Sequence, residues 1–220
     1  MQNKKEIPSL LEENSESMKV IVLARAGAGK TETIKKVIQK LIKEEIIAWE
    51  FLTGTTRSPR KGEVNNVDYL FCTEDEFKNG DFVSSIHPGG WVSYGVPYKE
   101  NSREGIGFFS PISLKYGTDT EEAFRKREPH IKTVFIVLDI DREVRAERMR
   151  MRGESEEGII KRFAIEDDEG PYDLSKLPSN TIVLSDPALG IEEVAEKIIE
   201  SIGIRKKILD LDKSVKPLSV

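Results

Sequence analysis

The chain has 220 residues, of which 38% are hydrophobic and 33% charged, and its formal net charge is −5. This size and composition are typical of one globular domain that can bury a core without disulfides or structural metals. The acidic balance argues against a surface built to coat nucleic acids, which needs an excess of basic residues. The single cysteine, Cys72, cannot form an intrachain disulfide, so we expect a reducing compartment. Because it follows Phe71 in an apolar run, we expect a buried structural thiol.

The two ends of the chain are polar. Residues 1–17 lack the apolar core of a signal peptide, and no apolar stretch approaches the roughly 20 residues needed to span a membrane. We therefore expect a cytoplasmic protein that makes no membrane contact. The expected organisation is a loose arm over residues 1–17, a domain over 18–204 and a tail over 205–220.

Apolar runs and helical patterns alternate along the chain. Lys19–Leu23 (KVIVL) predicts a buried parallel strand, and from Thr31 apolar residues recur at the three- and four-residue spacing of a helix. The segment 54–63 is rich in Gly, Pro and Arg and is predicted to be a loop. Thr73–Glu76 (TEDE) predicts a capping box that begins a short helix. Further strands are expected over 47–53, 67–71, 82–86, 92–94, 133–138 and 181–184, and further helices over 142–152, 155–168 and 191–202.

A glycine-rich segment lies between the predicted strand at 19–23 and the helix that follows. It reads ARAGAGKT, the spacing of the phosphate-binding Walker A motif with alanine in place of the first glycine. In such a loop the backbone N–H groups and the helix N-terminus surround phosphates, the lysine reaches the β- and γ-phosphates, and the hydroxyl binds Mg²⁺. ATP and Mg²⁺ are therefore the predicted cofactors, with Thr31 as the metal ligand. The predicted nucleotide-binding residues are Ala24, Arg25, Ala26, Gly27, Ala28, Gly29, Lys30 and Thr31.

Residues 55–71 read TTRSPRKGEVNNVDYLF and resemble the acceptor-binding segment of guanylate kinases. The resemblance continues through the pairs EF, DF and YG at 76–77, 81–82 and 94–95, and it extends from about residue 19 to 202. It implies that Arg57, Arg60, Tyr69 and Tyr94 hold the phosphate of the acceptor. The residue types support this independently, because planar guanidinium groups and phenol donors can grip a dianionic monophosphate.

Basic helical residues follow the apolar strand at 133–138. Arg148 and Arg152 are four apart on a predicted helix and share one face, whereas Arg145 and Arg150 point elsewhere and are expected to be solvated. With Arg162, the first two resemble the arginine-bearing lid of the same family. They would neutralise the transferred phosphoryl group and exclude water. The predicted catalytic residues are Lys30, Arg148, Arg152 and Arg162.

The chain departs from the family pattern where the acceptor's base would bind. The resemblance places Thr53 and Ser84 against the base, and Ser84 stands where the family has a glutamate. The segment 105–117 has no acid where the family strand ends in aspartates. Asp139 and Asp141 follow the next strand instead, and we expect a strand edge and a helix cap there, with Asp139 the residue that would bind Mg²⁺ if either did. Loss of the carboxylate should relax base discrimination.

These patterns predict an α/β fold: a P-loop NTPase three-layer parallel-sheet core with an inserted small β-rich acceptor-binding subdomain over about 53–98 and a helical lid over about 148–168. The predicted function is an ATP-dependent nucleoside monophosphate kinase with GMP as the expected acceptor. One alternative is a kinase of the same fold that acts on another nucleotide or a phosphorylated sugar. Another is a catalytically silent guanylate-kinase-like binding module, against which Lys30 and Thr31 argue because they are intact. No metal site is expected at His87 or His130, which lack partners at metal spacing.

Overall fold

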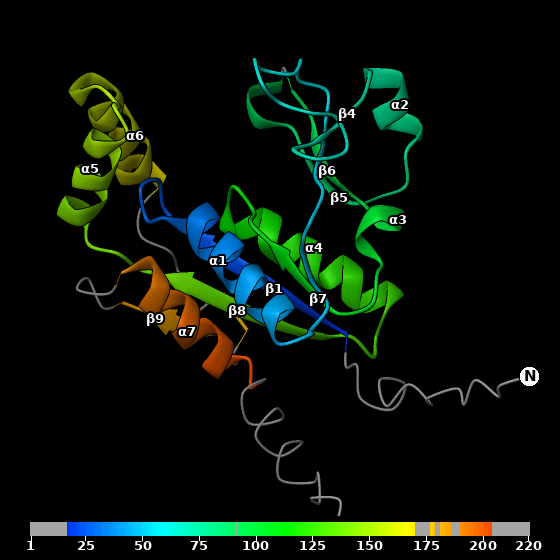
Figure 1. Cartoon of the computed structure of the whole chain (residues 1–220). Helices are drawn as coiled ribbons and strands as arrows, with labels where there is room; N and C mark the ends of the chain where they lie inside the picture. Colours follow the sequence, from blue (N-terminus) through cyan, green and yellow to red (C-terminus); the bar gives the residue numbers. More distant parts are fainter. Residues whose placement is uncertain (1–16, 91, 170–176, 179–180, 186–189, 204–220) are drawn as a thin grey trace, which may run out of the picture.

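The computed structural model describes residues 17–90, 92–169, 177–178, 181–185 and 190–203. The predicted arm (apart from Ser17) and tail lie outside the described residues. The described chain forms two sheets, a five-stranded one with the order β2-β7-β1-β8-β9 and a four-stranded one with the order β4-β3-β6-β5 (Figure 1). The predicted α/β class, with a parallel core sheet and a second β-rich part inserted in its first half, is confirmed.

Every strand pair of the five-stranded core sheet is parallel. Its central strands β1 and β8 are buried on both faces for most of their length, which is why they read as unbroken apolar runs in the sequence. The strands of this sheet are β1 (Met18–Ala24), β2 (Ala48–Glu50), β7 (Ile106–Phe109), β8 (Lys132–Leu138) and β9 (Ile182–Leu184).

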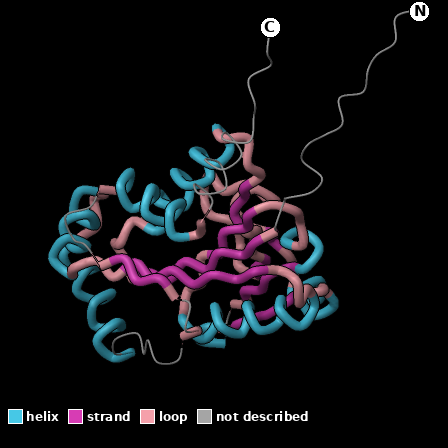
Figure 2. Tube along the Cα trace, turned by 90° about the horizontal axis from the view of Figure 1, so that it is seen from below, coloured by secondary structure: helices cyan, strands magenta, loops and turns pink. Residues whose placement is uncertain are grey.

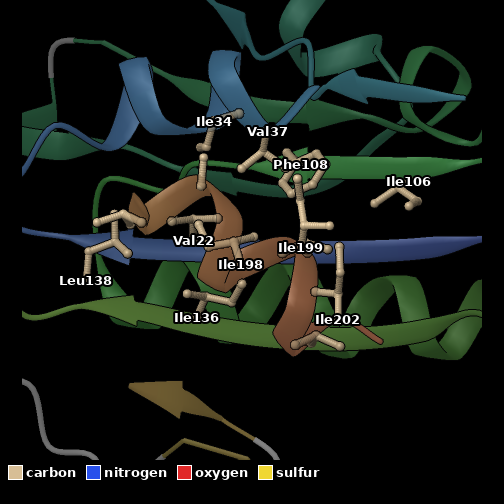
Figure 3. Close-up of a cluster of buried hydrophobic side chains, with 14 of the residues drawn as sticks. Val22, Ile34, Val37, Ile106, Phe108, Ile136, Leu138, Ile198, Ile199 and Ile202 are labelled. Atoms are coloured by element: carbon tan, nitrogen blue, oxygen red, sulfur yellow. The ribbon is translucent and has the colours of Figure 1, made fainter. Parts of the chain in front are cut away.

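Helices cover both faces of the core sheet, so that it lies between two helical layers (Figure 2). On one face, α1 (Lys30–Lys43) and α7 (Ile191–Ser201) pack side by side. Ile34 of α1 and Ile198 of α7 meet Val22 and Ile136 of the sheet in one apolar cluster (Figure 3). This periodic burial explains why the sequence predicted both helices correctly.

The other face of the core sheet carries α4 (Leu114–Arg127) and an aromatic cluster. Phe124 of α4 meets Phe51 edge to face, with ring centroids 5.5 Å apart, and Phe51 also stacks on Trp49 and Phe109. Such arrangements add to the area burial of the rings. The packing on this face is therefore mainly aromatic, whereas the packing on the opposite face is mainly aliphatic.

A lysine is buried in this aromatic layer. The Lys19 side chain lies on β1 with only 1% exposure, and its ammonium lies 4.8 Å from the Trp49 ring centroid and 5.2 Å from that of Phe124. It donates to the Asn101 backbone oxygen at 2.7 Å and lies 4.0 Å from Glu128. Burial lowers the pKa of Lys19 to about 8, because the charged form is poorly solvated there.

The second, smaller sheet follows β2 in the chain and returns to the core sheet at β7. Its capping box is confirmed: Thr73 accepts from the Glu76 backbone N–H at 3.2 Å, and Glu76 accepts from the Thr73 N–H at 2.7 Å. The elements of this part are β3 (Gly54–Thr55), β4 (Leu70–Phe71), α2 (Glu74–Asn79), β5 (Phe82–Ile86), the 3₁₀ turn η1 (Pro88–Gly90), β6 (Tyr94–Pro97) and α3 (Tyr98–Asn101).

Two further helices stand next to the N-terminal end of α1 (Figure 1). They are α5 (Arg142–Met151) and α6 (Glu156–Glu169), and they pack on each other through an apolar cluster that also touches Ala26. Asp141 caps α5 by accepting from the Glu143 and Val144 N–H groups at 2.8 and 3.4 Å. The predicted cap at the end of the LDID segment is thereby confirmed.

Several element predictions need correction. The segment 54–63 begins with strand β3 rather than loop, and the strand predicted over 92–94 lies at Tyr94–Pro97. Strand β2 ends at Glu50, so the strand expected to reach residue 53 is shorter. Strand β7 and helix α4 were not predicted as elements: β7 is only four residues long and contains Gly107, and α4 buries Gly117 and Thr120 where an amphipathic pattern would have apolar residues.

Candidate active site

The loop of residues 24–31, here called the phosphate loop, connects β1 to α1 in the predicted strand–loop–helix arrangement. Gly27 and Gly29 have φ values of +80° and +85°, a backbone conformation that residues with a Cβ rarely adopt. Gly29 is the N-cap of α1, and no side chain caps this end of the helix. The N-terminus of α1 therefore offers its backbone N–H groups and its positive dipole end to an anion.

Lys30 is the first residue of α1, and its ammonium donates to the backbone oxygen of Pro111, just beyond β7, at 2.8 Å. Burial lowers the pKa of Lys30 to about 8, and the carboxylate of Glu50 opposes this shift. Thr31 is exposed on the first turn of the helix. Glu50 ends β2 at the same edge of the sheet, and burial raises its pKa. The sequence analysis missed this acid, although a charged residue at the carboxyl end of a buried parallel strand was a usable signal.

Two arginines of α5 hold the phosphate loop by its carbonyl groups. Arg145 donates to the Ala26 oxygen and Arg148 to the Ala28 oxygen, each at 3.0 Å. The expectation that Arg145 is solvated is wrong, because it is only 5% exposed. The expectation that it points elsewhere than Arg148 is also wrong, because the two residues are three apart on α5 and both reach carbonyl groups of the phosphate loop. Arg150 lies on the surface and pairs with Glu156, as expected.

The other two arginines of the predicted lid, Arg152 and Arg162, are exposed on the surface. Helix α5 ends at Met151, so Arg152 is its C-cap; it is exposed, and its Nε donates to the Arg148 oxygen at 3.4 Å. Arg162 lies on α6, is exposed and pairs with Glu154. Within the described part of the chain, Arg148 is thus the predicted lid arginine that is hydrogen-bonded to the phosphate loop.

The structure brings three of the four residues predicted to bind the acceptor phosphate together in the smaller sheet. The Arg57 guanidinium lies 5.2 Å from the Tyr69 ring centroid, and the Tyr69 and Tyr94 rings are 6.3 Å apart. The guanidinium also forms two parallel 2.9 Å bonds to Glu63, whose pKa falls to about 2 because of Arg57 and of the Arg60 backbone N–H. The Arg60 side chain is exposed at the rim. Sequence reasoning missed Glu63 as a site residue, although it is part of the quoted motif.

Hydroxyl groups gather where the acceptor's base was expected. Ser84 of β5 lies 2.6 Å from the Thr120 hydroxyl of α4, and Thr120 donates its only hydrogen to the Tyr116 backbone oxygen at 2.6 Å. Ser84 must therefore be the donor to Thr120, which leaves its oxygen as an acceptor toward any other group. Tyr116 is only 2% exposed, and its buried hydroxyl has no hydrogen-bond partner among the described residues. Burial raises its pKa, against the effect of the nearby Ser84. Thr53 is half-buried just before β3.

The acidic and thiol groups that the structure describes outside these clusters do not form a metal centre. No group of three or more His, Cys, Asp or Glu side chains in the described part of the chain could hold a metal ion. Asp139 is exposed at the end of β8, where its N–H continues the pairing with β9 through Leu184. Cys72 is half-buried rather than fully buried, and its thiol lies 3.5 Å from the Thr55 oxygen. Among the helices that the structure describes, none is long and apolar enough to cross a membrane.

Comparison with known proteins shows which family the chain belongs to. A family model described as guanylate kinase matches residues 16–83, which contain the phosphate loop and the Arg57–Tyr69 segment. The guanylate kinase of Caldanaerobacter subterraneus is 31% identical over 205 residues, which cover 89% of this chain and 91% of that relative. The chain belongs to the guanylate kinase family. A Helicobacter pylori guanylate kinase is also 31% identical, over 68% of this chain and 72% of the relative.

A solved structure outside the guanylate kinase family shares the fold. A gluconokinase from Sinorhizobium meliloti superposes with a TM-score of 0.50 and 14% sequence identity, over 90% of this chain and 99% of that chain. At this identity the likeness concerns the arrangement of sheet and helices alone. Membership of the guanylate kinase family rests on the sequence relatives.

Proposed function

We propose that the protein transfers the terminal phosphoryl group of ATP to a nucleoside monophosphate and that GMP is its preferred acceptor. The observation that carries this proposal is the presence of two differently built anion sites in one chain. The phosphate loop, with its uncapped helix end and half-buried Lys30, suits a polyphosphate. The Arg57 guanidinium with Tyr69 and Tyr94 suits a single dianionic phosphate. The smaller sheet and the α5–α6 pair rise on either side of α1 (Figure 1).

The residues of the phosphate loop fit the phosphates of ATP with Mg²⁺. The positive φ values at Gly27 and Gly29 turn backbone N–H groups toward one concave side, as phosphate-binding nests require. Lys30 would neutralise charge on the transferred group, and Arg148, which donates to the Ala28 oxygen of the same loop, could add to this effect. Mg²⁺ would be held by the Thr31 hydroxyl and by the phosphates themselves, and would neutralise charge that develops during transfer.

On the acceptor side, Arg57 is already aligned for a phosphate. Its bidentate pair with Glu63 fixes the plane of the guanidinium before any ligand arrives, which reduces the entropy lost on binding. Tyr69 and Tyr94 supply neutral donors beside it. Arg60, exposed at the rim, has a side chain that could reach an incoming phosphate.

The preference for guanine is supported by the direction of the hydrogen bonds at Ser84. Because Ser84 donates to Thr120, its oxygen accepts from the ligand, and guanine presents adjacent N–H donors on its pairing edge where adenine presents a donor and an acceptor. The buried Tyr116 hydroxyl can serve as a second neutral partner. A neutral hydrogen-bond acceptor such as the Ser84 hydroxyl discriminates between bases less strongly than a carboxylate. We therefore expect the enzyme to prefer GMP and dGMP by a smaller margin than a carboxylate at this position would give.

The test is ADP formation from Mg·ATP with GMP, dGMP, AMP, CMP, UMP, dTMP and ribose bisphosphate. We expect GMP and dGMP to give the highest kcat/KM, and Lys30→Ala to abolish turnover with every acceptor while the fold is retained. Highest activity with another nucleotide or with the sugar phosphate would contradict the assignment of GMP and favour the alternative acceptor. Absence of turnover with all of them would favour a binding module.

A further inference from the structure

A buried group of charges lies behind the phosphate loop. The group comprises Arg25 of the loop, Arg145 of α5 and Glu166 of α6, and we call it the Glu166 cluster. One terminal nitrogen of Arg145 lies 2.9 Å from both carboxylate oxygens of Glu166, and a nitrogen of Arg25 lies 3.8 Å from one of them. The Arg25 side chain also donates to the Glu166 backbone oxygen at 3.4 Å. The cluster explains why a charged residue occupies the loop position at Arg25, for which the sequence offered no reason.

Arg145 is held by three partners at once. Besides Glu166, its guanidinium donates to the Ile140 oxygen at 3.0 Å and to the Ala26 oxygen at 3.0 Å. The N–H groups of a guanidinium point in fixed directions within one plane, so three partners determine its position. The Ala26 carbonyl is consequently turned away from the side of the loop where phosphates would bind.

The next residue of the loop is pressed against the same helix. A Cβ added at Gly27 would lie 2.7 Å from the backbone oxygen of Arg145, closer than a Cβ carbon approaches a non-bonded oxygen. Two successive loop residues, Ala26 and Gly27, are therefore set by one residue of α5: one through its side chain and the other through its backbone.

Glu166 lies on α6 and connects that helix to Arg145 and, through it, to the phosphate loop. Its side chain is only 12% exposed and neutralises two neighbouring guanidinium groups, whose burial without it would be costly. The Arg145 guanidinium also lies 5.1 Å from the ring centroid of Phe163, one turn earlier on α6. Helix α6, which carries Arg162, is thus fixed to the back of the phosphate loop.

We propose that Arg145 and Glu166 are positioning residues for the phosphoryl transfer: they hold the phosphate loop in its ATP-binding shape and couple the position of α6 to it. This inference rests on the proposed function in one respect, namely that the loop binds ATP. Neither side chain touches the substrate. Their effect is exerted through the Ala26 carbonyl, the Gly27 backbone and the packing of α6.

The α5–α6 pair contains a matched control for the test. Arg142 of α5 and Asp167 of α6 form an exposed bidentate pair at 2.6 and 3.0 Å, one residue from Glu166 in sequence. In Asp167→Asn the hydrogen-bonded ion pair between the same two helices is lost, and Arg25 of the phosphate loop loses only a weaker electrostatic interaction, since Arg142 is the larger cause of the lowered pKa of Asp167. In Glu166→Gln the carboxylate that serves Arg145 and Arg25 is lost.

The experiment measures ATP binding by calorimetry, KM for both substrates, and thermal stability. We expect Glu166→Gln to raise the ATP Kd and KM about tenfold, the effect of a slightly displaced binding group, while the acceptor KM stays unchanged. Asp167→Asn should leave all of these within about twofold, as expected for an exposed pair. Arg145→Lys keeps the charge but cannot serve three partners, so it should weaken ATP binding at an assay temperature well below its own melting temperature.

Equal ATP affinity in Glu166→Gln, Asp167→Asn and the unmodified protein would overturn the inference and leave the cluster a role in stability alone. If Glu166→Gln does not fold, Arg145→Lys decides, and unchanged ATP binding there overturns the inference in the same way. A protein that binds ATP but phosphorylates no nucleotide would contradict the proposed function only, because the ATP affinities of the variants would still be measured.

Discussion

Burial of Lys30 predicts that ATP binding is accompanied by proton uptake. The pKa of this lysine is lowered to about 8 in the structure, where its ammonium has a backbone oxygen as its hydrogen-bond acceptor. Phosphate oxygens beside the ammonium would favour its charged form, so binding should return the pKa toward its ordinary range. The fraction of Lys30 that is neutral in the free protein must then take up a proton when ATP binds.

The size of the effect follows from the pKa. With a pKa of about 8, binding should take up about 0.1 proton at pH 7, about 0.5 at pH 8 and about 0.9 at pH 9. By the same linkage, the Kd for ATP should rise about tenfold between pH 7 and pH 9, because an increasing share of binding free energy is spent on protonation. ATP affinity therefore falls as the pH rises through the pKa of Lys30.

The assay is titration calorimetry with ATP in buffers of different ionisation enthalpy, since the slope of the observed heat against that enthalpy gives the number of protons taken up. Lys30→Arg is the decisive control, because arginine stays charged and should abolish both the uptake and the pH dependence of Kd. Lys19→Met removes the other buried lysine with a pKa of about 8, near the opposite end of β1, and should change neither. Equal uptake in Lys30→Arg, or none at pH 8 in the unmodified protein, would refute the reasoning.

Three further outcomes follow from other contacts. The pKa of Lys19 is lowered to about 8 in the folded protein, so the unfolded chain binds more protons than the folded one above that pH. The free energy of unfolding should therefore rise with pH between about pH 8 and 10.5, by up to about 3 kcal/mol more than in Lys19→Met. Urea unfolding of both proteins at several pH values measures this difference. Glu63→Gln removes the bidentate partner of Arg57 and should raise the acceptor KM about tenfold with the ATP KM unchanged, in steady-state kinetics. Gly27→Ala adds left-handed strain of about 1–2 kcal/mol and a clash with the Arg145 backbone, so the variant should lose the rise in melting temperature that ATP gives the unmodified protein.

The parts of the fold that were predictable are those with strong local signals. Strands β1 and β8 read as apolar runs because both faces are covered, and α1 and α7 show helical spacing because one face of each meets the sheet. Helix α4 lacks that spacing of apolar residues: Thr120, whose hydroxyl makes a hydrogen bond with Ser84 of the smaller sheet, is buried but polar. A buried hydroxyl is satisfied by a residue distant in sequence, and a local pattern contains no information about that residue.

Some residues of the candidate site could likewise be predicted from the sequence, and others could not. Lys30 and the loop glycines follow from a motif whose spacing is set by phosphate geometry, and Arg57 follows from a resemblance. Arg145 was missed although it lies only three residues before Arg148, because a helical pattern does not tell which neighbouring element covers a basic residue: both arginines reach carbonyl groups of the phosphate loop. The sequence also could not predict the role of Glu166, because it lies 21 residues from Arg145 and the two meet only once α6 packs against α5.

The contact between Ser84 of β5 and Thr120 of α4 has a mechanical consequence. Strand β5 is the edge of the smaller sheet that touches the core layer, and β3, which leads into Arg57, lies two strands away in the order β4-β3-β6-β5. A rotation of the smaller sheet about this junction would therefore move Ser84 little and Arg57 far. Such a rotation would have its pivot at the proposed base-binding residue Ser84 and its largest displacement at Arg57, the proposed site of the acceptor phosphate.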